Sequence, residues 1–303
     1  MVKYVKNRTP LCLVDQKRKD AFEADKSAKE YVDTNSLYKC KKQENGIDLF
    51  PVKETLKEIY KNKCAYCETK FNRSFINIEH YRPKKSNHIT KDHQMEEHRL
   101  YYFLAYSWSN LLPICDVCNT KKSNNFDIEN EDNRISYAGE SLLDVQYITQ
   151  QYNDREKPKF IHPEIDDYES MFRFNKDGKI IVFLNIRDSY RMTYTIVNSD
   201  LNEQDLSDRR AKVLTDFINI KNELFEVFDL VYESKNREKI NKFKHTIERK
   251  IKEFFSDTNE FIAVRKFIIK KINLFLLGLD KKFVEFFKKR INIYIQTIEV
   301  YSN

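Results

Sequence analysis

Cys64-Ala-Tyr-Cys67 and Cys115-Asp-Val-Cys118 decide how the middle of this chain folds. Two residues between a pair of thiolates let one tight turn present both sulfurs to a single cation, and two such turns complete a tetrahedral site. The insertion of residues 68–114 is longer than in simple zinc ribbons, but the entropy cost of closing a loop grows slowly with its length. The spacing therefore predicts a structural Zn²⁺ held by these four cysteines.

Composition narrows the functional class. The 303 residues are 41% hydrophobic and 14% aromatic, which is enough to build a core and excludes wholesale disorder. The four glycines are scattered, so neither a Walker loop nor a dinucleotide-binding loop can be assembled from them. The chain therefore shows no ATPase or Rossmann signature of its own. With 54 basic and 47 acidic side chains, the net charge of +7 is compatible with a polyanion partner but does not prove one.

The sequence predicts no contact with a membrane. The longest uncharged run, residues 100–115, is shorter than the roughly 20 apolar residues that a helix needs to cross a bilayer. The N-terminus also lacks the apolar stretch of a signal peptide. We therefore expect a cytoplasmic protein, in a compartment where cysteines bind metals or stay free rather than form disulfides.

Hydrophobic periodicity indicates an α+β fold that is predominantly helical. Asp177-Gly178 between two alternating apolar runs predicts a β-hairpin over residues 171–184, whereas residues 127–160 are expected to have little regular structure. The predicted helices are 15–33, 51–62, one beginning near 207, 235–253, 260–277 and 281–301. The expected organisation is an N-terminal helical segment (1–50), a zinc-framed domain (51–130), a connector with the hairpin (131–200) and a helical C-terminal domain (201–303).

Residues suited to phosphodiester hydrolysis lie in and around the insertion between the cysteine pairs. This reaction needs a nucleophilic water, a base to deprotonate it and a cation on the scissile phosphate. Glu79 and His80 stand together in the segment Asn77-Ile-Glu-His-Tyr-Arg-Pro-Lys84. An unperturbed imidazole has a pKa near neutrality, so His80 is a candidate base. Glu79 offers a hard anionic oxygen that suits Mg²⁺.

Further polar residues complete the candidate site. Asn119 is expected to begin the helix after the second cysteine pair, and its amide oxygen would favour Mg²⁺ or Mn²⁺ as the catalytic ion. Asn110 lies in the returning strand, where its amide can tie the hairpin loop in place. Each of these residues alone also fits an ordinary surface or turn role, so it is their order within the zinc frame that is specific. The candidates for contacts with backbone phosphates are Arg82, Lys84, Lys121 and Lys122.

In this order, residues 64–122 resemble the HNH endonucleases, whose motif is a ββα-metal hairpin and helix. The resemblance implies a small ββα-metal nuclease unit in which His80 activates water and Glu79, Asn110 and Asn119 complete the catalytic site. Neighbouring residues of a strand point to opposite faces, but the family places the acid–histidine pair at a strand end, where both reach the cleft. Asn119 departs from the many family members that carry histidine at this position.

A narrower resemblance rests on the strings Cys64-Ala-Tyr-Cys-Glu68, Ile78-Glu-His-Tyr-Arg-Pro-Lys84 and Asn110-Leu-Leu-Pro-Ile-Cys-Asp-Val-Cys-Asn119. These strings look like the HNH nucleases of Septu-type and retron-associated antiphage systems, and the similarity covers most of residues 50–270. Proteins of that group act beside a separate ABC/SMC-type ATPase, which agrees with the missing phosphate loop. The resemblance thus implies an antiphage effector that works with an ATPase subunit or within a retron complex, and DNA is the favoured substrate.

Two alternatives stay open at this point. The same site could cut RNA, including tRNA, because hydrolysis by water does not need the 2′-hydroxyl. The chain could instead be a non-catalytic zinc module that binds nucleic acid or protein, with the basic helices 235–253 and 264–290 as its working surface.

Overall fold

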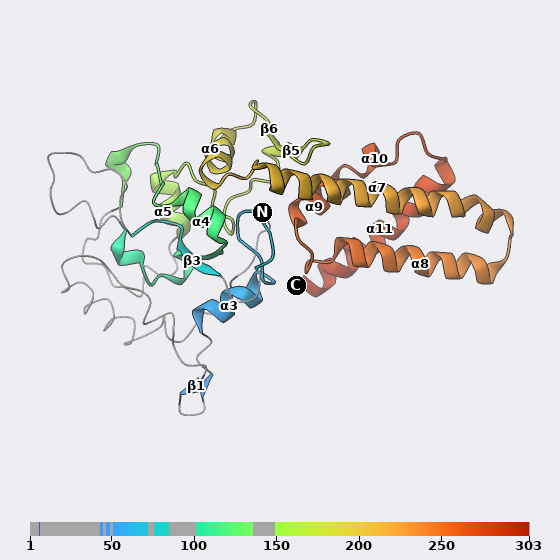
Figure 1. The fold of residues 1–303 in the computed structure, drawn as a ribbon, viewed down its shortest axis with the longest axis horizontal. Coiled ribbons are helices and arrows are strands. Elements are labelled where there is room, and N and C mark those ends of the chain that lie inside the picture. Colours follow the sequence, from blue (N-terminus) through green and yellow to red (C-terminus); the bar gives the residue numbers. More distant parts are fainter. Residues whose placement is uncertain are drawn as a thin grey trace. The chain divides into compact units, whose positions relative to one another are not determined.

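The structure is a computed structural model, and it describes residue 6 and residues 43–44, 47–48, 51–71, 76–84, 101–135 and 149–302 (Figure 1). The chain divides into two compact units. Unit 1 comprises residues 1–172 and 182–201, and unit 2 comprises residues 173–181 and 202–303. The predicted helix over 15–33 lies outside the described residues, as does most of the predicted N-terminal segment (1–50). The domain boundaries drawn from the sequence stay predictions.

Unit 1 contains the expected ββα arrangement. Strand β3 (Asn77–His80) pairs antiparallel with β4 (Leu111–Ile114), and the register places Glu79 opposite Leu112 and His80 opposite Leu111. Helix α4 (Asp116–Lys122) begins directly after β4 and contacts β3 (Figure 1). All four residues of β4 are buried, which explains why this strand reads as a continuous apolar run rather than an alternating one. The predicted fold class is confirmed.

Other helices support this unit. Helix α3 (Val52–Ile59) begins right after Pro51, as the sequence predicts, and buries Val52 and Leu56 while contacting β4. Helix α6 (Ser189–Ser199) packs against α4. Smaller elements of this unit are β1 (Gln43–Glu44), β2 (Ile47–Asp48) and the 3-10 turns Tyr102–Leu104, Trp108–Asn110 and Glu131–Asn133.

Helix α5 (Thr149–Glu156) corrects the expectation of little regular structure over residues 127–160. Its side chains at Tyr152, Asn153 and Glu156 are buried. Because two of these three residues are polar, the helix lacks the apolar stripe by which a sequence normally reveals a packed helix.

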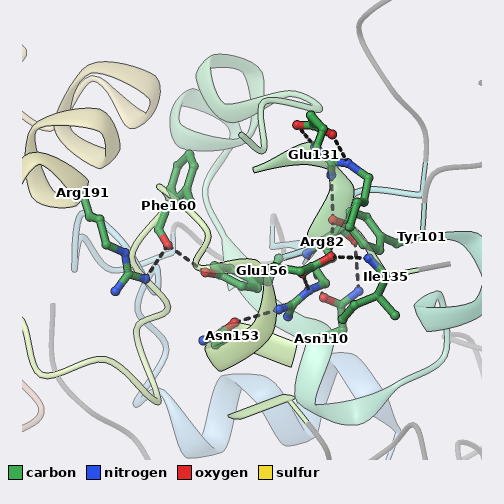
Figure 2. A network of polar contacts seen from close by, with 11 residues as sticks. Arg82, Tyr101, Asn110, Glu131, Ile135, Asn153, Glu156, Phe160 and Arg191 are labelled. Atoms are coloured by element: carbon green, nitrogen blue, oxygen red, sulfur yellow. Dashed lines mark hydrogen bonds and ion pairs between the residues drawn. The ribbon is translucent and has the colours of Figure 1, made fainter. Parts of the chain in front are cut away.

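The buried face of α5 holds the end of β3 through an ion pair (Figure 2). The Arg82 guanidinium donates to Glu156 Oε2 through Nε (2.8 Å) and to Asn153 Oδ1 through Nη2 (2.8 Å). The other carboxylate oxygen of Glu156 accepts from Tyr101 Oη (2.7 Å) and from the backbone N–H of Ile135 (2.9 Å). Arg82 is 1% exposed and Glu156 is fully buried, so each charge depends on the other for its stabilisation.

Unit 2 is built from long helices. Helix α7 (Gln204–Glu233) and helix α8 (Arg237–Phe255) lie side by side, and α8 packs against α11 (Lys281–Ser302) (Figure 1). Three contacts join α8 to α11 in the same order along both helices, so the two run parallel. They are Phe243 with Phe286, Glu248 with Arg290, and Phe255 with Tyr294. Ring contacts of Phe217 and Phe228 fill the space between α7, α8 and α11.

The rest of unit 2 agrees with the sequence in part. Strands β5 (Phe172–Phe174) and β6 (Ile180–Val182) form the expected hairpin, with Gly178 in its turn at φ +72°. The two end residues of the hairpin, Phe172 and Val182, belong to unit 1. The helix predicted over 260–277 is instead two helices, α9 (Ile262–Lys270) and α10 (Ile272–Phe275). Lys271, at φ −110°, separates them with a non-helical backbone conformation.

Replacing Glu156 by glutamine should leave the buried Arg82 guanidinium without its counter-charge. We expect Glu156→Gln to lower the free energy of unfolding by about 3–5 kcal/mol, the usual cost of breaking a buried ion pair from one side. Glu131→Gln is the matched control, because it removes an ion pair with Arg134 whose acidic side chain is 68% exposed. That pair should contribute less than about 1 kcal/mol. Urea unfolding monitored by circular dichroism measures both values, and equal losses would contradict the assignment.

The hairpin turn gives a second test. Alanine at position 178 would place its Cβ 2.0 Å from the Ser207 carbonyl oxygen, whereas alanine at position 278 would meet no heavy atom within 4 Å. Both glycines have positive φ, so both substitutions carry a backbone cost of about 1 kcal/mol. Gly178→Ala should cost about 1–3 kcal/mol more than Gly278→Ala because of the overlap. Comparable melting temperatures for the two variants would refute this close approach.

Candidate functional site

The four predicted cysteines meet at one point. The sulfurs of Cys64, Cys67, Cys115 and Cys118 all lie within 4.8 Å of one another, and the Sγ atoms of Cys67 and Cys115 are 3.7 Å apart. A tetrahedron with metal–sulfur bonds near 2.3 Å has sulfur–sulfur edges of about 3.8 Å. Burial raises the pKa of the Cys64 thiol, because a thiolate there would lose its hydration. A bound cation would reverse that penalty, so this donor set fits a metal ion.

Backbone hydrogen bonds shape the first cysteine turn. The N–H of Cys64 donates to Thr69 O (3.0 Å), and the N–H of Glu68 donates to Cys64 O (3.1 Å). Glu68 takes a positive φ of 63°, which closes the turn directly after Cys67. The N–H of Ala65 then donates to Pro113 O (2.9 Å), which ties this turn to β4. The second turn needs no such bridge, because Cys115 caps α4 and Cys118 lies within it.

Glu79 and Lys122 form a buried ion pair at the end of β3. The Lys122 side chain is fully buried, and its Nζ contacts Glu79 Oε1 and donates to His80 O (3.2 Å). The Glu79 side chain is 10% exposed. Burial raises the pKa of Glu79, and the Lys122 ammonium acts in the opposite direction by favouring the carboxylate. The helix that follows the second cysteine pair thus places a cation on the predicted acidic residue.

His80 is oriented by a backbone carbonyl. Its Nε2 lies 3.0 Å from Ala105 O, and because a carbonyl oxygen only accepts, Nε2 must carry the proton in this hydrogen bond. Burial lowers the pKa of His80 to about 3, and the nearby charges of Lys84 and Lys122 act in the same direction. The ring is therefore neutral at physiological pH, with the lone pair on Nδ1.

Asn110 clamps the backbone just beyond His80. Its Oδ1 accepts from Arg82 N (2.8 Å), and its Nδ2 donates to Arg82 O (3.1 Å) and Leu104 O (3.2 Å). The backbone N–H of Tyr81 also donates to Asn110 O (2.8 Å). Asn110 lies in the 3-10 turn before β4 rather than in the strand itself, which corrects its expected position. The whole residue is only 2% exposed, and its side-chain amide is used to hold these backbone groups.

Two of the four residues expected to contact phosphates lie inside the protein. Arg82 is committed to Glu156 and Asn153, and Lys122 to Glu79 and the His80 carbonyl, so neither presents its charge to a nucleic-acid backbone in this structure. Lys121 remains at the surface with 52% of its side chain exposed, and its Nζ is 2.9 Å from Asp200 Oδ2. Lys84 is half-buried.

Asn119 lies near the middle of α4 rather than at its start, because the helix already begins at Asp116, inside the second cysteine pair; this corrects its expected position. Its backbone N–H donates to Cys115 O (2.9 Å), and its side chain is half-buried. Since α4 contacts β3, the helix carries Asn119 beside the strand of Glu79 and His80. The structure thus brings Glu79, His80 and Lys122 into direct contact and places Asn119 on the neighbouring element.

Sequence reasoning missed three residues that support the site. Glu156 and Asn153 hold the Arg82 side chain, and Lys6 binds the start of β4. The Lys6 Nζ donates to Trp108 O (2.7 Å) and Leu111 O (2.5 Å) and pairs with Glu164 (3.1 Å). No local pattern signals such a contact, because Lys6 and Trp108 are 102 residues apart.

Comparison with known protein families places this site in a named class. Residues 64–125 match the family model described as "HNH endonuclease". The matched region begins at the first cysteine pair and ends just after α4, so it contains both cysteine turns, β3 and β4. No solved structure matches the chain.

Three curated relatives carry the name Septu protein. The PtuB protein of Bacillus mycoides (strain KBAB4) is 37% identical over 167 residues, which is 54% of this chain and 51% of the relative. The PtuA protein of the same strain is 26% identical over 165 residues, 54% of this chain and 21% of the relative. The PtuB protein of Bacillus thuringiensis is 34% identical over 73 residues, 23% of each chain. The chain thus spans about half the length of the first of these relatives and less of the other two.

Across the described part of the chain, each helix is too short or too polar to cross a membrane. The cysteine cluster, the ββα unit and the sequence matches agree on one class. The chain therefore contains an HNH endonuclease domain at residues 64–125 and is a relative of the Septu proteins.

Proposed function

We propose that this chain is a metal-dependent endonuclease that hydrolyses nucleic-acid phosphodiester bonds, with DNA as the favoured substrate. The observation that carries the proposal is the end of β3, where Glu79 and His80 lie beside α4 inside the segment that matches the HNH model. RNA is the alternative substrate, because the same hydrolysis does not require a 2′-hydroxyl.

His80 is the proposed general base. Its hydrogen bond to Ala105 O fixes the Nε2–H tautomer, which leaves Nδ1 to take a proton from the attacking water. Burial lowers the pKa of His80 to about 3, which keeps the ring neutral at physiological pH, the form that a general base needs, but also weakens its basicity. The clamp of Asn110 on Arg82, two residues further on, makes Asn110 a positioning residue for this strand end.

Glu79 and Asn119 are the proposed holders of a catalytic Mg²⁺ or Mn²⁺. Carboxylate and amide oxygens are the hard donors that these ions prefer. When bound, such an ion would stabilise the negative charge that develops on the scissile phosphate. The Lys122 ammonium favours the ionised carboxylate of Glu79 and so opposes the rise in its pKa that burial causes. Of the four residues predicted to contact phosphates, Lys84 and Lys121 are those not fully buried, and we keep them as candidates for contacts with the substrate backbone.

Zinc is the metal we propose for the four cysteines. An all-sulfur tetrahedral set is typical of structural zinc, because it leaves no open position for a reacting water. Its role here is to fix the start of α4 against the first cysteine turn.

The biological setting follows from the relatives. We propose that the chain acts as the nuclease effector of an antiphage defence system, as its resemblance to the Septu group implies. We also propose an ABC/SMC-type ATPase subunit as its partner, since the chain carries no nucleotide-binding loop of its own.

Removing the proposed base tests the activity. His80→Ala should reduce cleavage of plasmid DNA or total tRNA by at least about 100-fold in Mg²⁺ or Mn²⁺, the typical contribution of a general base. His245→Ala is the matched control, because that histidine is 77% exposed on α8. Wild type in EDTA should also be inactive. Cleavage that persists in folded His80→Ala would contradict the proposal, and the nucleic acid that wild type cuts identifies the substrate.

Removing one sulfur tests the structural metal. Cys64→Ser should lose the bound zinc. Because zinc binding contributes to folding, the free energy of unfolding should fall by much more than about 1 kcal/mol, the typical loss for a single substitution. Cys12→Ser is the control, since Cys12 has no partner pattern in the sequence. Elemental analysis and urea unfolding provide the two measurements. A Cys64→Ser protein of normal stability and metal content would exclude a structural metal here.

A further inference from the structure

A groove in unit 2 lies outside the candidate site. It has a volume of about 580 Å³ and runs between α8 and α11. Glu248, Lys252 and Phe255 line it from α8, and Arg290, Ile293 and Tyr294 line it from α11. Two carboxylates also line the groove: Glu248, which pairs with Arg290 (3.3 Å), and Asp257, which follows α8.

Lysines extend both edges of this groove. Lys244, Glu248 and Lys252 are spaced four residues apart on α8, so they form one stripe along the helix. On α11, Lys282, Lys289 and Ile293 recur at seven and four residues and form a second stripe. Because Glu248, Lys252 and Ile293 line the groove, the remaining lysines of each stripe continue its edges. None of these four lysines makes an ion pair within the residues that the structure describes.

Charge is unevenly divided among the three long helices. Helix α8 has seven basic and three acidic residues, and α11 has five and two, so their net charges are +4 and +3. Helix α7 has four basic and seven acidic residues, a net charge of −3. Helix α9 (Ile262–Lys270) adds three basic and no acidic residues, so the positive charge of unit 2 lies on α9 and on the two helices that form the groove, and such charge attracts a polyanion.

Among the described residues of the nuclease domain, three of the basic side chains are already engaged in ion pairs. Arg82 and Lys122 are buried in such pairs, and Lys121 is paired with Asp200. Affinity for nucleic acid without sequence preference comes largely from contacts between phosphates and basic side chains. Basic residues of unit 2 can supply further contacts of this kind.

We propose that the groove edged by Lys244, Lys252, Lys282 and Lys289 binds the phosphodiester backbone of a nucleic acid without reading its sequence. This inference rests on the proposed nuclease function. The spacing of the lysines supports it: seven or eight residues of helix span about 10–12 Å at 1.5 Å per residue. That distance matches about three nucleotide steps of 3.4 Å, so two lysines along one edge can contact phosphates of one strand.

Binding can be measured separately from cleavage. The groove variant replaces Lys244, Lys252, Lys282 and Lys289 by glutamine in the His80→Ala background, without added Mg²⁺ or Mn²⁺, so that no reaction occurs. The control variant replaces four exposed lysines on turns and edges of the same unit by glutamine, which gives the same net charge. The control positions are Lys176, Lys179, Lys235 and Lys271. Fluorescence anisotropy with labelled single-stranded and double-stranded DNA and RNA oligonucleotides gives Kd at several salt concentrations.

We expect the groove variant to bind at least about tenfold more weakly, and the slope of log Kd against log salt to fall by about 3, since each lost phosphate contact removes about 0.9. The control should keep the slope of the parent, and both variants should keep its melting temperature. Equal losses in the two variants would overturn the proposal, because net charge alone would then explain binding. Unchanged binding in the groove variant would also overturn it and would assign the groove to an acidic protein partner. Wild type that binds through the groove but does not cleave, even with the proposed ATPase subunit added, would instead refute the nuclease function alone.

Discussion

The convergence of four cysteine sulfurs is the constraint on which the nuclease domain depends. The four sulfurs lie within 4.8 Å of one another, so the turn at residues 64–67 and the start of α4 meet at one point that fits a metal ion. The hydrogen bond from Ala65 to Pro113 connects the same turn to β4. The direction of α4 then places Lys122 against Glu79, so the position of the cysteine cluster is linked to the contacts of a residue it does not touch.

Buried charge is the second organising feature. Within four residues at the end of β3, Glu79 pairs with Lys122 and Arg82 pairs with Glu156. Such pairs add little net stability, because desolvation offsets the attraction, but wrong arrangements that leave one partner alone are strongly disfavoured. The backbone between them is held by Asn110, and the His80 ring is held by Ala105 O. The strand end that carries the candidate base therefore has one permitted arrangement.

The sequence predicts the parts of this fold that follow local rules. Cysteine spacing predicts the metal cluster, Asp177-Gly178 predicts the hairpin, and apolar periodicity predicts most of the long helices. It does not predict whether a basic residue faces the solvent or a buried carboxylate, so Arg82 and Lys122 look like surface cations until their partners are known. Helix α5 escapes detection because its buried face is polar, and the contact of Lys6 with Trp108 has no local signal at all.

The parallel course of α8 and α11 has a consequence for how unit 2 folds. Helices α7 and α8 are neighbours in the chain and can associate as soon as both exist, whereas α11 must return past α9 and α10 before it meets α8. Contacts between distant residues form later than local ones, so we expect α11 to dock last. Until then, Phe228 and Phe243 lack their Phe283 and Phe286 neighbours and expose an aromatic surface to other chains. A ribosome releases α11 after the other helices of the unit, so during synthesis this surface is the part of the nascent chain that a chaperone would cover.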